Sequence, residues 1–87
     1  MFSIVSVSSS TTLSALSRDS VRLTFTVPSG YTPKFVTTWS RDSAFYIVYN
    51  KKYSDIANGI IMLGVFNGFS DPVTAVAGAD IICVKDM

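Results

Sequence analysis

The side chains that could carry out chemistry are few in this sequence. The chain has no histidine, a single cysteine (Cys83), and six acidic residues that are all aspartates. Without histidine, the usual serine and cysteine nucleophile arrangements lack their general base. A lysine base, Lys51 or Lys52, could be imagined beside Ser43, but serine is simply common in this chain. We therefore predict no catalytic residue and no enzyme activity.

A catalytic pair of carboxylates and a metal or cofactor site are equally poorly supported. Asp42, Asp55 and Asp71 all fall in expected turns, where aspartate commonly caps its own backbone. With one cysteine and no histidine, the chain offers neither a disulfide nor the usual ligands of structural zinc. Cys83 lies in an apolar segment and is expected to be a buried, inert thiol. We predict no metal and no cofactor.

The aromatic residues are the remaining candidates for a functional surface. Tyrosine and tryptophan are favoured at interfaces because each ring combines an apolar body with a polar group. The alternative for each of them is simple core filling. The candidate interface or ligand surface consists of Tyr31, Trp39, Tyr46, Val48, Tyr49 and Tyr53.

The elements that would position these residues are predicted to be β-strands. The chain has no glutamate and no glutamine, so the strong surface helix formers are largely missing, whereas valine, isoleucine and threonine are abundant. The clearest strand is Val21 to Val27, in which apolar and polar residues alternate strictly, so that Val21, Leu23, Phe25 and Val27 should face the core. It ends at Pro28-Ser29-Gly30, where Gly30 should adopt a positive φ.

The other strands follow from turn residues and apolar runs. They are expected at Phe2 to Val7, Lys34 to Ser40, Ala44 to Tyr49, Gly59 to Phe66, Val73 to Ala77 and Ala79 to Lys85. Residues 8–12 are predicted to be a flexible connection, 41–43 a break, 50–58 a polar loop, and Gly78 an interruption. About seven short strands in 87 residues predict one domain, residues 1–87. Its expected fold is a small antiparallel β-sandwich, jelly-roll-like, with a small β-barrel as the alternative.

The composition predicts association with other copies. Hydrophobic residues make up 48% of the chain and charged residues only 15%, which is more apolar surface than one small core can hide. The strand Ala44 to Tyr49 carries large apolar groups on both faces: Phe45, Ile47 and Tyr49 on one, Tyr46 and Val48 on the other. A two-layer monomer covers only one of these faces. We expect a homo-oligomer with Tyr46 and Val48 in its interface.

Other partner classes are disfavoured by charge and length. The net charge is +1 and the charges are scattered, which gives no electrostatic footprint for nucleic acid or an anionic membrane. The longest apolar run, Ile60 to Phe66, is far shorter than the roughly 20 residues needed to span a bilayer. The first residues, Met1 to Val5, lack the basic start of a signal peptide, so we expect synthesis in the cytoplasm.

One segment carries a resemblance to a known family. Leu23-Thr24-Phe25-Thr26-Val27-Pro28-Ser29-Gly30-Tyr31-Thr32-Pro33, with its "TVPSGYTP" turn, resembles carboxy-terminal domains of bacteriophage and prophage tail-fibre, baseplate and minor structural proteins. The later family segments correspond here to Phe35 to Trp39, Phe45 to Tyr49, Met62 to Asn67 and Ile81 to Lys85. The loop Lys51 to Asn58 is longer than the tight turn of the family pattern.

The resemblance implies a role and a location. It implies a structural module of the phage virion, on a tail fibre, baseplate or capsid surface, that assembles as a homotrimer with other virion proteins as further partners. It leaves attachment to a host-surface glycan open. The alternative of another class is a small-barrel protein that binds single-stranded nucleic acid, stacking bases on Tyr46, Tyr49 and Tyr53 beside Lys51 and Lys52.

Overall fold

The computed structural model describes residues 1–41 and 45–87, and the fold in these residues is all-β. The strands are β1 (Phe2–Leu13), β2 (Arg18–Thr24), β3 (Tyr31–Ser40), β4 (Tyr46–Tyr49), β5 (Ile60–Phe66) and β6 (Val73–Lys85). The 3-10 turns η2 (Lys51–Tyr53) and η3 (Ile56–Asn58) lie between β4 and β5. The predicted small antiparallel β-sandwich is confirmed. Six strands are described where about seven were expected.

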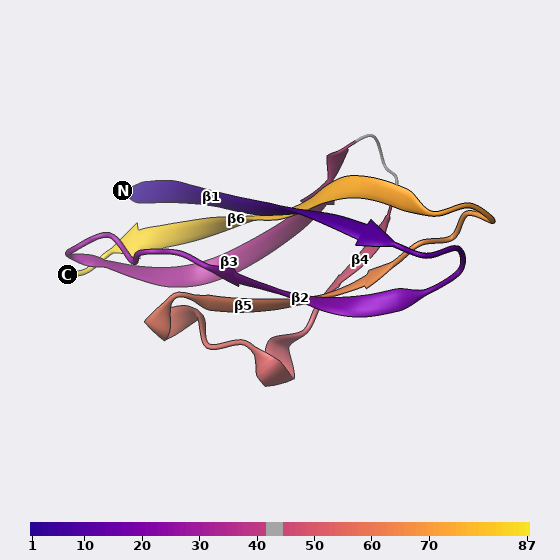
Figure 1. Cartoon of the computed structure of the whole chain (residues 1–87). Coiled ribbons are helices and arrows are strands. Elements are labelled where there is room, and N and C mark those ends of the chain that lie inside the picture. Colours follow the sequence, from indigo (N-terminus) through magenta and orange to yellow (C-terminus); the bar gives the residue numbers. More distant parts are fainter. Residues whose placement is uncertain (42–44) are drawn as a thin grey trace.

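The strands form two antiparallel three-stranded sheets, in the orders β1-β6-β3 and β2-β5-β4 (Figure 1). The first strand pairs with the last, β1 with β6, in one sheet, and the second pairs with the fifth, β2 with β5, in the other. This nested pairing, which alternates between the two sheets, is typical of a jelly roll. The molecule is long and thin, with extents of 50 × 23 × 15 Å. Such a thin sandwich has one core layer and two broad outer faces.

The core lies between the two central strands. Alternate residues of β5 (Ile61, Leu63, Val65) and of β6 (Ala77, Ala79, Ile81, Cys83) are almost completely buried. The edge strands add Leu13, Val21 and Leu23, and Phe45 joins them just before β4. These side chains form a single cluster, because a strand sends every second residue to the same face.

The predicted alternation around Val21 is confirmed in part. Val21 and Leu23 are buried, whereas Phe25 and Val27 are only half-buried because β2 ends at Thr24. The predicted turn follows, with the N–H of Tyr31 donating to the carbonyl of Pro28 at 3.1 Å and Gly30 at a φ of 81°.

The prediction of a flexible connection at residues 8–12 is wrong, because β1 continues to Leu13. Each of these residues faces a partner on β6, from Ser8 opposite Gly78 to Thr12 opposite Thr74. Serine has little intrinsic preference for strands, so the hydrogen-bonded pairing with β6 stabilises the strand here. The Thr12 and Thr74 hydroxyls also share a hydrogen bond of 2.7 Å across the two strands.

The expected interruption near Gly78 is also wrong, since β6 runs unbroken from Val73 to Lys85. This single long strand replaces the two strands predicted at Val73 to Ala77 and Ala79 to Lys85. β3 ends at Ser40, just before the expected break at 41–43. The rest of that break, residues 42 and 43, and the expected start of a strand at Ala44 lie outside the described residues.

The polar segment before β5 contains two short turns. η3 ends at Gly59, which has a φ of 75°, a conformation that residues with a Cβ rarely adopt. A Cβ there would lie 2.0 Å from the carbonyl oxygen of Phe25, whose N–H donates to the Gly59 carbonyl at 2.9 Å. Gly59 thereby ties this segment to the end of β2.

One buried polar side chain, Asn67, holds the connections at one end of the sandwich together. Its amide nitrogen donates to the carbonyls of Leu13 (3.2 Å), Ser14 (3.1 Å) and Asp71 (2.9 Å), and its oxygen accepts the N–H of Phe69 at 2.9 Å. These bonds join the β1–β2 and β5–β6 connections. Buried polar groups are tolerated only when satisfied in this way.

Replacing Asn67 with alanine is expected to lower the free energy of unfolding by about 2 to 4 kcal/mol, because several buried hydrogen bonds are lost at once. Asn58→Ala is the matched control: Asn58 is exposed and donates one side-chain bond of 2.7 Å, to Asp55. That change should cost less than about 1 kcal/mol. Urea denaturation of both variants measures the difference, and equal losses would contradict the role assigned to Asn67.

Candidate interaction surface on the outer sheet faces

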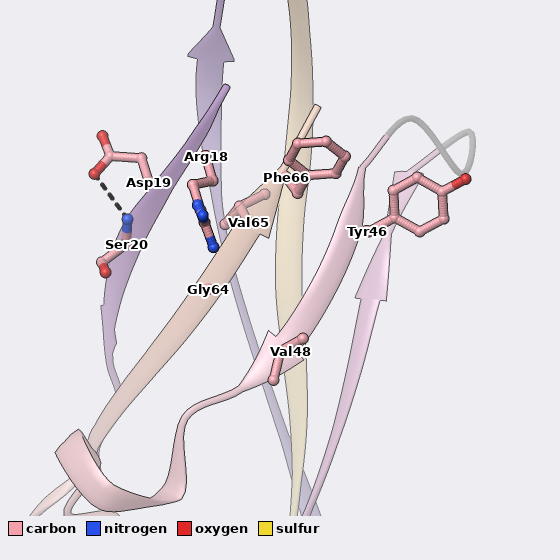
Figure 2. A pocket seen from close by; sticks show the side chains of 8 residues that line it. All are labelled: Arg18, Asp19, Ser20, Tyr46, Val48, Gly64, Val65 and Phe66. Atoms are coloured by element: carbon pink, nitrogen blue, oxygen red, sulfur yellow. Dashed lines mark hydrogen bonds between the residues drawn. The ribbon is translucent and has the colours of Figure 1, made fainter. Parts of the chain in front are cut away.

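The outer face of the β2-β5-β4 sheet contains an open hollow of about 350 Å³ (Figure 2). The strand register fixes its walls: Arg18, Phe66 and Tyr46 form one row across the sheet. Ser20, Gly64 and Val48 form the next row. The lining is completed by Asp19 and Val65.

Gly64 makes the hollow possible because no side chain rises from the middle of the face. A Cβ at this position would meet only the carbonyl oxygen of Val48, at an ordinary contact distance of 3.9 Å. Tyr46 and Phe66 close one end, with ring centroids 6.0 Å apart. The side chain of Tyr46 is 70% exposed and that of Val48 is 67% exposed. This face is therefore apolar, open and rimmed by the guanidinium of Arg18.

The predicted surface residues do not form one surface. Tyr46 and Val48 line the hollow. As predicted, they lie on the opposite face of the strand from Phe45, Ile47 and Tyr49. Tyr31 and Tyr49 are half-buried and pack against the core, so they do not share this outer face.

Trp39 belongs to the outer face of the other sheet, where it has a structural role. Its ring lies over Gly78, so that a Cβ on this glycine would be 2.3 Å from the indole Cζ2. The indole N–H donates to Asp80 Oδ1 at 3.2 Å, and the Ser6 hydroxyl donates to the same oxygen at 2.7 Å. An aromatic ring covering a strand glycine compensates for the missing side chain, which explains why β6 continues through Gly78.

Tyr53 lies apart from both faces, on η2. It is 63% exposed, and the Lys52 ammonium is 5.5 Å from its ring centroid. The three tyrosines named for base stacking are thus separated: Tyr46 faces outward on β4, Tyr49 packs inward, and Tyr53 is in the turn.

A second apolar area covers part of the outer face of the β1-β6-β3 sheet. Phe2 and Ile4 on β1, Phe35 on β3 and Val84 on β6 all have exposed side chains. A bulge between Pro33 and Phe35 shifts the register of β3, so that Phe35 lies opposite Ile82 on this outer face. Both broad faces of the sandwich therefore carry apolar side chains.

Sequence reasoning missed six residues of the hollow: Arg18, Asp19, Ser20, Gly64, Val65 and Phe66. The alternation in β2 could have revealed two of them. If the strand is extended back to Arg18, the alternation that points Val21 and Leu23 inward points Arg18 and Ser20 outward.

Two of the residues considered for chemistry, Cys83 and Asp55, show local structural roles. Cys83 is completely buried, and burial raises the pKa of its thiol. Asp55 accepts a hydrogen bond from the Asn58 amide within its own turn. Ser43 lies outside the described residues. In residues 1–41 and 45–87, no three metal-binding side chains gather, and no helix is long and apolar enough to cross a membrane.

No family model matches the chain, and no significant match exists among curated proteins or solved structures. The resemblance to phage tail-fibre domains rests on the sequence pattern alone.

Gly78→Ala is expected to destabilise the fold by about 1 to 3 kcal/mol, because the added methyl collides with the ring of Trp39. Gly64→Ala is the control on the other central strand, where the methyl enters the open hollow. It should be neutral or stabilising by up to about 1 kcal/mol, since alanine loses less backbone entropy on folding. Thermal unfolding of the two variants measures both effects, and a neutral Gly78→Ala would refute the covering role of Trp39.

Proposed function

We propose that this protein is a structural module of a bacteriophage virion, without catalytic activity, that works by assembling with copies of itself. The outer face of the β2-β5-β4 sheet, around Tyr46, Val48 and Phe66, is its assembly surface. A homotrimer is the proposed form, since three-fold association agrees with the tail-fibre resemblance and closes without an open end. Attachment to a host-surface glycan is a further role left open by the same resemblance.

The observation that carries the proposal is the exposure of large apolar side chains on a sandwich whose core is already complete. Tyr46 and Val48 are more than two-thirds exposed, while the core side chains behind them are fully packed. Apolar atoms left in water cost about 25 cal/mol per Å² relative to their burial. Covering this face with a second copy removes that cost.

The nucleic-acid alternative has less support. Its stacking tyrosines do not share one surface, because Tyr49 packs against the core. A net charge of +1 also provides little attraction for a phosphate backbone.

Val48→Asp is expected to reduce the mass of the assembly threefold, because burial in the interface would remove the hydration of the new carboxylate, a cost that attraction to Arg18 would not offset. Leu16→Asp is the matched control: Leu16 is 62% exposed, lies in the β1–β2 turn, and has a φ of 53° that aspartate tolerates. This variant should assemble like the unmodified chain. Sedimentation equilibrium measures the masses, and circular dichroism verifies that both variants are folded.

The contradictory result is an unmodified chain that remains a 9.4 kDa monomer across micromolar concentrations. In that case assembly is refuted, and the hollow beside Tyr46 becomes the candidate surface for a ligand.

A further inference from the structure

The outer edge of β1 differs from the other three sheet edges. Native proteins protect exposed edges with charges, proline, bulges or short strands. β2 carries Arg18, Asp19 and Arg22, β4 has only four residues, and β3 contains Pro33 with a bulge beside it. β1 has none of these features: its twelve residues contain no charge and no proline, and its register with β6 is unbroken.

The orientation of the free backbone groups on β1 follows from one hydrogen bond. The N–H of Lys85 donates to the carbonyl of Met1 at 3.0 Å, so Met1 and Lys85 are a hydrogen-bonded pair of the antiparallel ladder. Bonded and non-bonded pairs alternate in such a ladder. The N–H and C=O groups that point away from β6 therefore belong to Phe2, Ile4, Ser6, Ser8, Ser10 and Thr12. In the described residues, these groups form no backbone hydrogen bond to another element.

We propose that β1 pairs with β1 of a second copy, antiparallel and related by a two-fold axis, so that two three-stranded sheets become one continuous six-stranded sheet. Directly opposite residues must share a sheet face, and the outward-pointing groups must meet one another. Both conditions are satisfied, and all six outward-pointing residues find partners, when Val7 lies opposite its counterpart. Ser6 then lies opposite Ser8 of the copy, and Ile4 lies opposite Ser10.

A second copy suits this edge better than another kind of chain. The two edges have the same length by symmetry, and an uncharged strand meets no like-charge repulsion when it pairs with itself. The central hydroxyls of Ser6 and Ser8 come together across the axis, where serine and threonine pairs add hydrogen bonds. The contact uses a sheet edge, so it is independent of the assembly face around Tyr46 and Val48.

Ser8→Pro tests the pairing. Proline removes the outward N–H of Ser8 while leaving the bonds to β6 intact, because an edge strand tolerates proline where the N–H faces solvent. Sedimentation equilibrium should show a twofold reduction in mass relative to the unmodified chain. Ser8→Ala, which keeps the N–H, should show no reduction. The twofold change is distinct from the threefold change expected for Val48→Asp, so either contact can fail without the other.

A folded Ser8→Pro chain with the same mass as Ser8→Ala would overturn the proposal. Ser9→Pro tests the assigned orientation, since the N–H of Ser9 points toward β6 and its loss should lower the melting temperature more than Ser8→Pro does. If Ser8→Pro does not fold, hydrogen exchange of the unmodified chain replaces it. The amides of Ser6, Ser8 and Ser10 should exchange more slowly as the protein concentration rises. Exchange independent of concentration, in a chain that does associate, would exclude β1 from the contact.

Discussion

The structure depends on one packing interaction, that of β5 against β6, which are the central strands of the two sheets. Each strand sends every second side chain into the one core, and those of Ile61, Leu63 and Ile81 are completely buried there. The pleat leaves no freedom for the intervening residues, which must point outward. Because this chain is apolar at many of those positions too, the rule that builds the core also exposes Tyr46, Val48 and their neighbours.

The two outer faces differ in how their outward-pointing apolar side chains are arranged. On the β1-β6-β3 sheet, Trp39 covers Gly78 and donates its indole N–H to Asp80, so part of the face is covered from within the chain. On the β2-β5-β4 sheet, Gly64 has no such cover, and a hollow remains beside Tyr46 and Val48. The same residue type in a central strand thus supports a packed face in one sheet and an open face in the other. The open face is the one that the proposed assembly uses.

The sequence predicted those features that depend on local periodicity. The all-β class, the strand predicted at Gly59 to Phe66 and the two faces of the strand containing Tyr46 all follow from composition, apolar runs and alternation. Features that depend on distant partners could not be predicted in this way. Serines at positions 8–10 form a strand because β6 lies beside them, and Gly78 stays in a strand because Trp39 covers it. Asn67 is buried where its amide reaches the carbonyls of Leu13 and Ser14, which are far away in the sequence. Of the candidate surface, Tyr46 and Val48 share one face, while Tyr31 and Tyr49 pack against the core.

Tyrosine nitration of the unmodified chain tests the central claim, that the face carrying Tyr46 is covered by another copy, most directly. In a single chain, Tyr46 and Tyr53 have nearly equal exposure, 70% and 63%, so Tyr53 is an internal standard. Mass spectrometry after brief nitration should show Tyr53 modified several times faster than Tyr46, with the difference lost when the chain is unfolded. Equal modification of the two tyrosines in the native protein at micromolar concentration would contradict the account.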